Sequence, residues 1–231
     1  QQGLTDEDLL AATAKADRIL NEIEAMVAKS KNHVNIAYTP ADLYRLKAEG
    51  KKAIMLGIEN GYAIGKDIAN VERFRKRGVV YLTLCHNGNN QLCGSCRDND
   101  ENVGVNAFGE QVIHEMNRVG MIVDISHSGI QTFYDALDIS TKPIVASHSS
   151  SRALCNHPRN LTDEQMKALA QKGGVAQVTL YNGFLKEEGK ATIQDAIAHL
   201  NHMVDVMGIE HVGIGTDFDG DGGIIGCAPA S

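Results

Sequence analysis

Two neighbouring segments, MIVDISH at residues 121–127 and PIVASHS at residues 143–149, hold the strongest structural signal in this chain. Each is a largely apolar run, without regular polar alternation, that leads into a histidine. Runs of this kind are typical of strands that are buried on both faces of a parallel sheet. Because the carboxyl ends of neighbouring parallel strands meet at one edge of their sheet, we expect His127 and His148 to lie side by side.

The same pattern occurs four more times along the chain. An apolar run leads to a polar residue in AIMLGIE at Glu59, in VVYLTLCH at His86, in GVAQVTLYN at Asn182 and in HVGIGTDFD at Asp217. Together the runs predict six parallel strands. Polar groups at the carboxyl ends of successive parallel strands are where a (β/α) barrel builds its active site. The repetition therefore predicts an enzyme, although it gives Asn182 no role.

Helical patterns fill the intervals between these strands. Thr5 and the carboxylates after it favour a helix N-terminus, and apolar residues then recur at steps of three and four from Leu9 to Met26. Further helices are predicted at residues 40–50, 68–77, 108–119, 129–137, 166–172 and 192–207. The alternation of strand and helix indicates βαβ units. The Asn-, Gly- and Cys-rich residues 87–107 show no periodicity, and a loop of that length is more often functional than idle.

The strand count falls short of a closed barrel. Such a barrel has eight strands and typically about 250 residues, whereas this chain of 231 residues offers six strands and opens directly on a helix. Its last residues, GDGGIIGCAPAS, add no helix to cover the sixth strand. We therefore expect a single α/β domain over residues 1–231, a TIM-type (β/α)8 barrel that lacks its first two strands. The sequence is expected to be cut on its N-terminal side and to be short at its C-terminus.

Composition excludes several classes of function. Hydrophobic residues make up 43% of the chain and charged residues 22%, as in ordinary globular domains. A net charge of −7 without any basic run argues against a nucleic-acid partner. No apolar stretch reaches the roughly 18 residues of a membrane span, and the first residues lack the features of a signal peptide. The compartment, cytoplasmic or exported, stays open, because an export signal would lie in the missing N-terminal part.

The five cysteines are too few and too widely spaced for a disulfide scaffold. Cys93 and Cys96 have the C-x-x-C spacing of a redox pair or of half a zinc knuckle. No second pair completes a structural zinc site, and the motif does not open a helix in a thioredoxin-like βαβ unit. The simpler interpretation is that these are loop cysteines.

The polar residues at the strand ends have the chemistry of a metal site. Imidazole and carboxylate groups suit zinc, and a pair of metal ions needs a shared bridging ligand. Glu59 follows a strongly apolar run, where a carboxylate is costly to bury without a positive partner. Taken singly, a histidine at a strand end is often a rim residue with satisfied hydrogen bonds, and Asp217 could cap a loop. Taken together, the four residues Glu59, His127, His148 and Asp217 predict a metal-dependent hydrolase.

At these residues the chain resembles the membrane (renal) dipeptidase family of zinc metallopeptidases. The matching segments are GIENG, LTLCHNGNN, MIVDISH, SHSSSRALCNHPRN and HVGIGTDFDG, in that order. The resemblance implies a (β/α)8 barrel related to the amidohydrolases. It also implies an enzyme that hydrolyses dipeptides with two zinc ions, through a hydroxide that bridges the metals. A homodimer is compatible with this interpretation.

The resemblance also implies roles for individual residues. Glu59 corresponds to the carboxylate that bridges the two metals, and His127 and His148 correspond to ligands of the second metal. Asp217 resembles the catalytic carboxylate that moves protons at the reacting water and the leaving amine. In the substrate site, His86 resembles the histidine that contacts the scissile carbonyl. Arg159 resembles the arginine that pairs with the carboxylate of the substrate, a bidentate task for a guanidinium.

One departure from the family pattern is serious. The first strand of the family ends in a His-x-Asp pair that completes the first metal site, and no His-x-Asp occurs in this chain. Asn60, where many members have glycine, is a smaller departure. Two alternatives therefore stay open beside the dipeptidase: another amidohydrolase-type metal hydrolase, such as a deaminase or lactonase, and a non-catalytic degenerate homologue.

Overall fold

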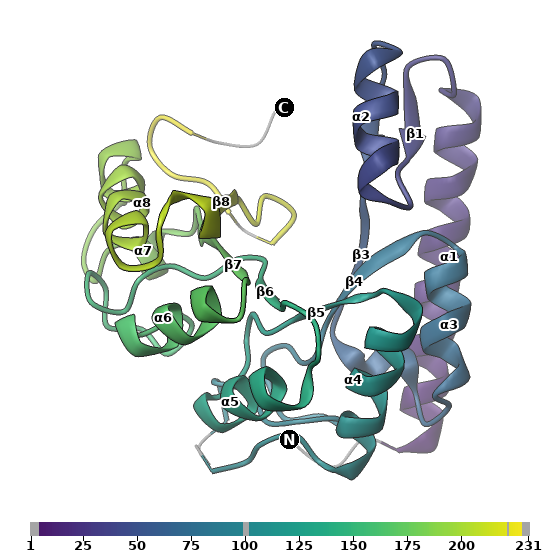
Figure 1. Ribbon diagram of the computed structural model, residues 1–231, viewed down its shortest axis with the longest axis horizontal. Helices are drawn as coiled ribbons and strands as arrows, with labels where there is room; N and C mark the ends of the chain where they lie inside the picture. The colour runs from purple at the N-terminus through teal and green to yellow at the C-terminus, as the bar shows by residue number, and fades with distance from the viewer. Residues whose placement is uncertain (1–4, 99–101, 221, 228–231) are drawn as a thin grey trace.

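A computed structural model describes residues 5–98, 102–220 and 222–227. Its centre is a sheet of six parallel strands whose spatial order is their order in the chain, and the sheet curls like part of a barrel wall (Figure 1). The strands are β3 (Leu56–Glu59), β4 (Val79–Thr83), β5 (Ile122–Asp124), β6 (Val145–Ala146), β7 (Val175–Thr179) and β8 (Val212–Gly215). The six predicted strands and the α/β barrel class are confirmed.

Helices follow the strands along the chain and cover the outer face of the curl (Figure 1). They are α3 (Ala69–Lys76), α4 (Ala107–Val119), α5 (Ile130–Ile139), α6 (Asp163–Gln171), the short α7 (Asn182–Leu185) and α8 (Ile193–Met207). Two 3-10 turns, η1 (Gly61–Ile64) and η2 (Ile209–His211), complete the connections. The predicted helices are therefore present, with ends displaced by a few residues. The expected lack of a covering helix at the end of the chain falls partly on residues 228–231, outside the described part.

Local sequence explains where these helices begin and end. Thr5 caps α1 (Asp6–Lys29) in a reciprocal capping box with Asp8, as the sequence predicts. Thr162 and Gln165 form the same box at the start of α6. Gly120 ends α4 in the left-handed conformation, with φ 74°, which glycine adopts without steric cost.

The first predicted strand is wrong in one respect. The run AIMLGIE does not form one strand: Lys52–Ile54 forms β2, and β3 begins only at Leu56. The reason is that β2 pairs with an unpredicted strand, β1 (Val34–Ile36), in a separate two-stranded parallel sheet. Helix α2 (Pro40–Ala48) connects them, and this unit lies beyond the end of the main sheet (Figure 1).

Strands β5 and β6 are shorter than the apolar runs that predict them. In these runs, His127 and His148 lie in loops beyond the strand ends rather than on the strands. The Asp124 carboxylate is the cause, because its Oδ1 accepts hydrogen bonds from the backbone N–H groups of Ser126 at 3.0 Å and Ser147 at 2.9 Å. The side chain thus replaces strand pairing at this edge and frees both histidine segments to turn toward each other.

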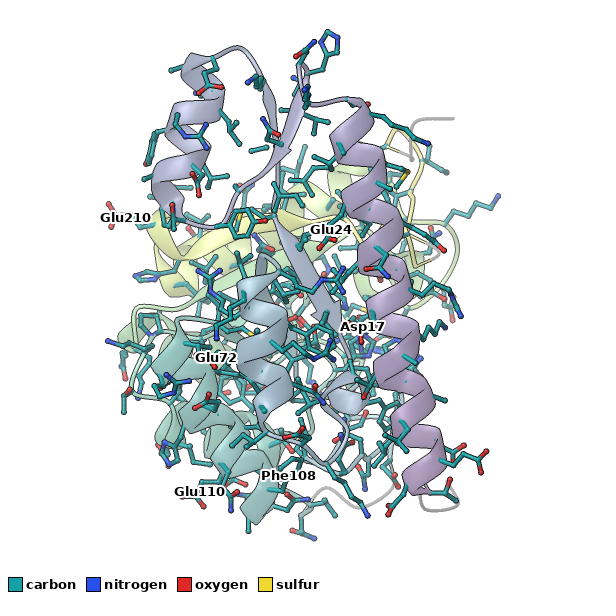
Figure 2. All side chains as sticks on the ribbon, turned by 90° about the vertical axis from the view of Figure 1, so that its right-hand side faces the viewer. Asp17, Glu24, Glu72, Phe108, Glu110 and Glu210 are labelled. Carbon is teal, nitrogen blue, oxygen red and sulfur yellow. The ribbon has the colours of Figure 1, made fainter. Side chains whose placement is uncertain are left out.

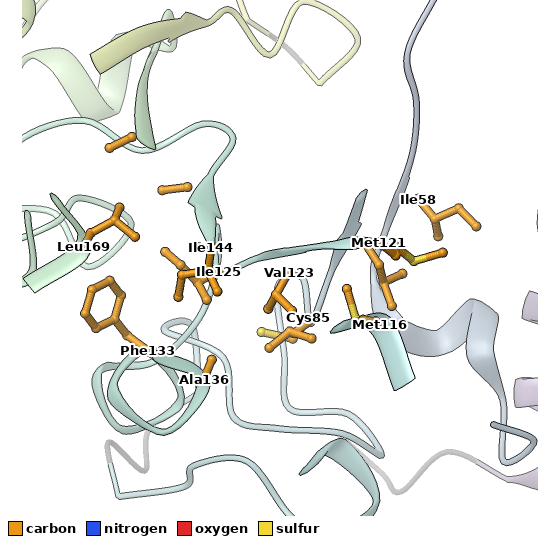
Figure 3. Close-up of a cluster of buried hydrophobic side chains, with 14 of the residues drawn as sticks. Ile58, Cys85, Met116, Met121, Val123, Ile125, Phe133, Ala136, Ile144 and Leu169 are labelled. Atoms are coloured by element: carbon orange, nitrogen blue, oxygen red, sulfur yellow. The ribbon is translucent and has the colours of Figure 1, made fainter. Parts of the chain in front are cut away.

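The hydrophobic core lies between the sheet and its covering helices. Figure 3 shows side chains of β5 and of the segments after β4 and before β6 beside side chains of α4 and α5. Met116, Val123, Ile125, Phe133 and Ile144 are at most 2% exposed. The loops after the carboxyl ends of the strands, which carry the candidate site, therefore rest on a closely packed base.

Helix α1 packs beside α3 through ion pairs (Figure 2). Asp17 accepts hydrogen bonds from Arg73 at 2.5 Å and from Arg77 at 3.0 Å, and Glu24 pairs with Arg77. Partly exposed pairs of this kind contribute about 0–1 kcal/mol each, so they fix the position of α1 more than they stabilise it. In the described residues, none of the helices combines the length and the hydrophobicity that a membrane-crossing segment needs.

Candidate metal centre

Three side chains from separate strand ends meet at the carboxyl edge of the sheet. Nε2 of His127 lies 2.9 Å from Nε2 of His148, and Oε1 of Glu59 lies 3.1 Å and 3.2 Å from these two nitrogens. Glu59 is the last residue of β3, whereas the histidines follow β5 and β6. The three donor atoms therefore form a nearly equilateral triangle built from residues far apart in the sequence.

This triangle has the size and chemistry of a metal-binding face. Zinc binds imidazole nitrogen and carboxylate oxygen at about 2.0–2.2 Å, and one ion at such distances can contact three atoms spaced as these are. Metal ligation needs neutral imidazole and ionised carboxylate. Burial lowers the pKa of His127 to about 3, so its ring is neutral. Burial raises the pKa of Glu59, but hydrogen bonds from His127 and His148 outweigh it and hold that pKa below its usual range. The residues present thus fit a divalent cation.

Glu59 is less enclosed than the sequence suggests. Its side chain is 43% exposed, although both histidines that it contacts are largely buried. Its second oxygen, Oε2, lies 4.0 Å from Nε2 of His86. One carboxylate oxygen thus faces the pair while the other remains available to a further group.

His86 follows β4 and lies against the same cluster. Its ring centroid is 4.3 Å from that of His127, and its side chain is 39% exposed. Donor atoms of Glu59, His86 and His127 all lie within 4.8 Å of one another. The structure therefore brings His86 to the open side of the triangle, where an imidazole can contact either a metal ion or a bound molecule.

Three residues of this region carry backbone strain. Asn60, His127 and Asp217 have φ values of 80°, 69° and 58°, and within the described ranges they are the residues other than glycine with positive φ. Such conformations cost of order 1–3 kcal/mol and cluster at functional sites. Asparagine tolerates positive φ better than most residues, and the Asn60 side chain also accepts a hydrogen bond from the backbone of Tyr62. This accounts for a residue other than glycine after Glu59.

Asp217 lies just beyond β8, in a tight turn. Together with Glu59 and His148 it lines a cavity of about 490 Å³. Burial raises the pKa of the Asp217 carboxyl above its ordinary value. Gly215, two residues before Asp217, lies close to the backbone of Ser147. A Cβ at position 215 would clash with the backbone oxygen of Ser147. A carboxylate with raised basicity therefore faces the same cavity as two of the triangle residues.

Arg159 is a buried cation with unused donors. Its residue surface is 3% exposed, and Nη2 donates to the backbone oxygen of His148 at 3.2 Å. Nε and Nη1 have no hydrogen-bond partner among the described residues. Burial lowers the pKa of Arg159, yet a guanidinium stays protonated in proteins. With His127 it lines a cavity of about 70 Å³, so its unpaired N–H groups suit an anionic ligand.

Sequence reasoning missed three residues that support the cluster. Asp124 and Ser147 contact each other beneath His148, and Ser95 of the long loop donates to the backbone oxygens of His86 and His127. The sequence held a signal for Asp124, because it is a carboxylate inside an apolar strand. Ser95 had none, because residues 87–107 lack periodicity; of these, residues 99–101 lie outside the described part.

Asn182 has a structural role, whereas the cysteines show no role in the part of the chain that the structure describes. Asn182 begins α7, donates to the backbone oxygen of Gly223 at 3.2 Å and accepts from the backbone of Ala191 at 2.9 Å. It therefore ties loops together away from the triangle. The five cysteines are free thiols; Cys93 is buried and Cys96 is partly exposed.

Comparisons with known proteins agree with this architecture. The family model described as membrane dipeptidase (peptidase family M19) matches residues 4–227. An uncharacterized dipeptidase of Schizosaccharomyces pombe is 38% identical over 201 residues, which cover 84% of this chain and 48% of that protein. The chain thus spans about half the length of this curated relative.

Solved structures show the same fold. An amidohydrolase from Pseudomonas aeruginosa is 33% identical with a TM-score of 0.83, over 88% of this chain and 62% of that one. The probable dipeptidase PvdM from the same organism is 27% identical with a TM-score of 0.86, over 90% and 68%. A metallopeptidase from Rhodobacter sphaeroides, liganded with a phosphinate mimic of the dipeptide L-Ala-D-Ala, is 25% identical with a TM-score of 0.81, over 89% and 61%. Fold and family match agree, and this chain belongs to the membrane dipeptidase family, peptidase family M19.

Proposed function

We propose that the full-length protein is a zinc-dependent dipeptidase. The observation that carries this proposal is the triangle of Glu59, His127 and His148, with edges of 2.9, 3.1 and 3.2 Å. Family membership supports the reaction class, and the ligand set of two imidazoles and one carboxylate supports zinc. The proposed substrate is a dipeptide, the ligand class that the Rhodobacter sphaeroides metallopeptidase binds as a mimic.

We infer that Glu59 would be a ligand shared by two metal ions. Its Oε1 lies 3.1 Å from Nε2 of His127, and its Oε2 lies 4.0 Å from Nε2 of His86, so the carboxylate has contacts on both of its oxygens. This chain would supply the histidine site through His127 and His148. The remaining ligands of the other ion would be a His-x-Asp pair, which the sequence of these 231 residues does not contain.

The proposed mechanism divides the work between Asp217, which lines the 490 Å³ cavity, and His86, which lies against His127. Zinc, when bound, supplies a Lewis acid and lowers the pKa of water in its coordination shell. Asp217, whose pKa is raised by burial, accepts the proton of the attacking water and donates it to the departing amine. His86, on the open side of the triangle, donates a hydrogen bond to the carbonyl oxygen as negative charge develops on it.

Metal removal tests the proposal most directly. Dialysis of the full-length protein against a chelator is expected to abolish dipeptide hydrolysis, and added zinc is expected to restore it, because the Lewis acid provides several kcal/mol of transition-state stabilisation. Rates are measured by amine release from a panel of dipeptides, with metal content determined in parallel. Mock dialysis without chelator is the control. Hydrolysis that persists after complete metal removal would sink the proposal.

Arg159 is proposed to bind the substrate's carboxylate. The variant Arg159→Lys keeps the charge but loses the planar pair of donors. We expect it to reduce the preference for a dipeptide over the same dipeptide with a C-terminal amide by about 10–100-fold in kcat/KM, because charged hydrogen bonds contribute roughly 1.5–3 kcal/mol.

A neighbouring arginine provides the matched control for this prediction. Arg152 lies in the same loop, but its donors already bind the backbone oxygens of His157, Pro158 and Asn160. The variant Arg152→Lys should therefore keep the preference for the free carboxylate. If Arg159→Lys, folded and loaded with metal, still discriminates between acid and amide as the unsubstituted protein does, Arg159 is not the carboxylate site.

A further inference from the structure

A fully buried acidic group with a dense set of hydrogen bonds lies beneath the candidate metal centre. Asp124 is 0% exposed, and its carboxylate accepts four hydrogen bonds from neutral donors. Oδ2 accepts from the hydroxyls of Thr83 at 2.6 Å and Ser147 at 2.5 Å, and Oδ1 accepts from two backbone N–H groups. A buried carboxylate requires such compensation. The network thus joins the ends of β4, β5 and β6 at one anionic group.

Ser147 connects this carboxylate to His148. Its Oγ lies 2.5 Å from Oδ2 of Asp124 and 2.8 Å from Nδ1 of His148. An ionised carboxylate can only accept hydrogen bonds, so the single hydroxyl proton of Ser147 points to Asp124. The Ser147 oxygen can then accept from Nδ1–H of His148, which leaves Nε2, directed at Glu59 and His127, as the nitrogen that would bind a metal ion.

The second histidine of the triangle has no such support. Nδ1 of His127 is buried and, in the part of the chain that the structure describes, has no hydrogen-bond partner. The two imidazoles therefore differ: the tautomer of His148 is set by an oriented chain of hydrogen bonds, and that of His127 is not.

We propose that Asp124, acting through Ser147, is a positioning residue that holds His148 with its Nε2 lone pair directed at the metal centre. This inference rests on the proposed function only in treating His148 as a metal ligand. Groups that orient ligating histidines raise their basicity, and their loss typically weakens metal binding by about 10–100-fold. Here the orienting carboxylate acts through an intervening hydroxyl rather than by direct contact.

Ser147→Ala is the variant that tests the proposal, and Thr83→Val is its matched control. Each removes one hydroxyl donor from Oδ2 of Asp124, but only Ser147 contacts His148. Zinc affinity of the full-length protein is measured by competition with a chromogenic chelator. We expect Ser147→Ala to weaken zinc binding by about 10–100-fold and Thr83→Val to keep the affinity of the unsubstituted protein. Asp124→Asn should weaken binding as Ser147→Ala does.

A second measurement begins with the unsubstituted protein. In the zinc-loaded protein labelled with ¹⁵N-histidine, the Nδ1 proton of His148 should resonate downfield and exchange slowly, as a proton in a strong hydrogen bond does. The Nδ1 proton of His127 should not, and in Ser147→Ala that of His148 should come to resemble it. A His148 Nδ1 proton without this signature, or unchanged zinc affinity in folded Ser147→Ala, overturns the positioning role while zinc binding itself stands. Failure of the unsubstituted protein to bind zinc overturns the proposed function as well.

Discussion

Replacing Glu59 with glutamine is expected to remove bound zinc and to reduce dipeptide hydrolysis by the full-length protein by at least about 10³-fold. The amide keeps the shape of the side chain but loses the charge that faces both histidines at 3.1 and 3.2 Å. Two neutral imidazoles alone make a weak zinc site, because structural and catalytic zinc sites have three or four protein ligands. Metal content after gel filtration and the rate of hydrolysis are measured on the same preparation.

A surface glutamate controls for loss of charge alone. Glu110 lies in the first turn of α4, and its side chain is 56% exposed. Glu110→Gln changes the net charge as Glu59→Gln does and should leave zinc and activity as they are. Retention of stoichiometric zinc and full hydrolysis by Glu59→Gln would remove the triangle from the mechanism.

Asp217→Asn is expected to separate catalysis from metal binding. Zinc should remain bound, because the triangle does not include Asp217, whereas kcat should fall by about 10²–10⁴-fold as for loss of a general acid–base group. Burial raises the pKa of Asp217, and the group accepts a proton only when ionised. Activity should therefore decline as pH falls through this raised pKa, at a higher pH than an ordinary aspartate would give. That decline should be absent from the residual activity of the variant.

Asp219, two residues further along the same turn, is the control for this prediction. It lines the same cavity but has no assigned role. Asp219→Asn should keep both kcat and the acid side of the pH profile. An Asp217→Asn variant with unchanged kcat, or one that loses zinc together with activity, would contradict the assignment of proton transfer to Asp217.

The strand ends could be predicted because their signal is local. A run of apolar residues that leads to His127 or His148 is visible in seven residues, and parallel topology then brings such ends together. The family resemblance rested on the same segments, and the family match confirms it. The assigned roles of the individual residues stay predictions until variants are measured.

Features that depend on tertiary partners were not predictable. The division of AIMLGIE into β2 and β3 follows from pairing with β1, a strand of three residues whose sequence VNI carries little signal. Strands β5 and β6 end early because the side chain of Asp124 takes the backbone donors. The hydroxyl of Ser95 contacts the backbone oxygens of His86 and His127, and Ser95 belongs to a loop whose sequence shows no periodicity. In each case at least one deciding contact joins segments distant in the sequence: β1 with β2, Asp124 with Ser147, and Ser95 with His127.

The three residues of the triangle lie far apart in the sequence, and this has a consequence for folding. Residues 59, 127 and 148 reach one another only after β3 to β6 have paired, so the donor set does not exist in an unfolded or half-assembled chain. An ion that binds only the finished arrangement shifts the folding equilibrium by about 2.7 kcal/mol when its free concentration is one hundred times its Kd. Metal supply would then govern how long the protein survives proteolysis, and scarcity of zinc would lower the amount of protein present as well as its activity.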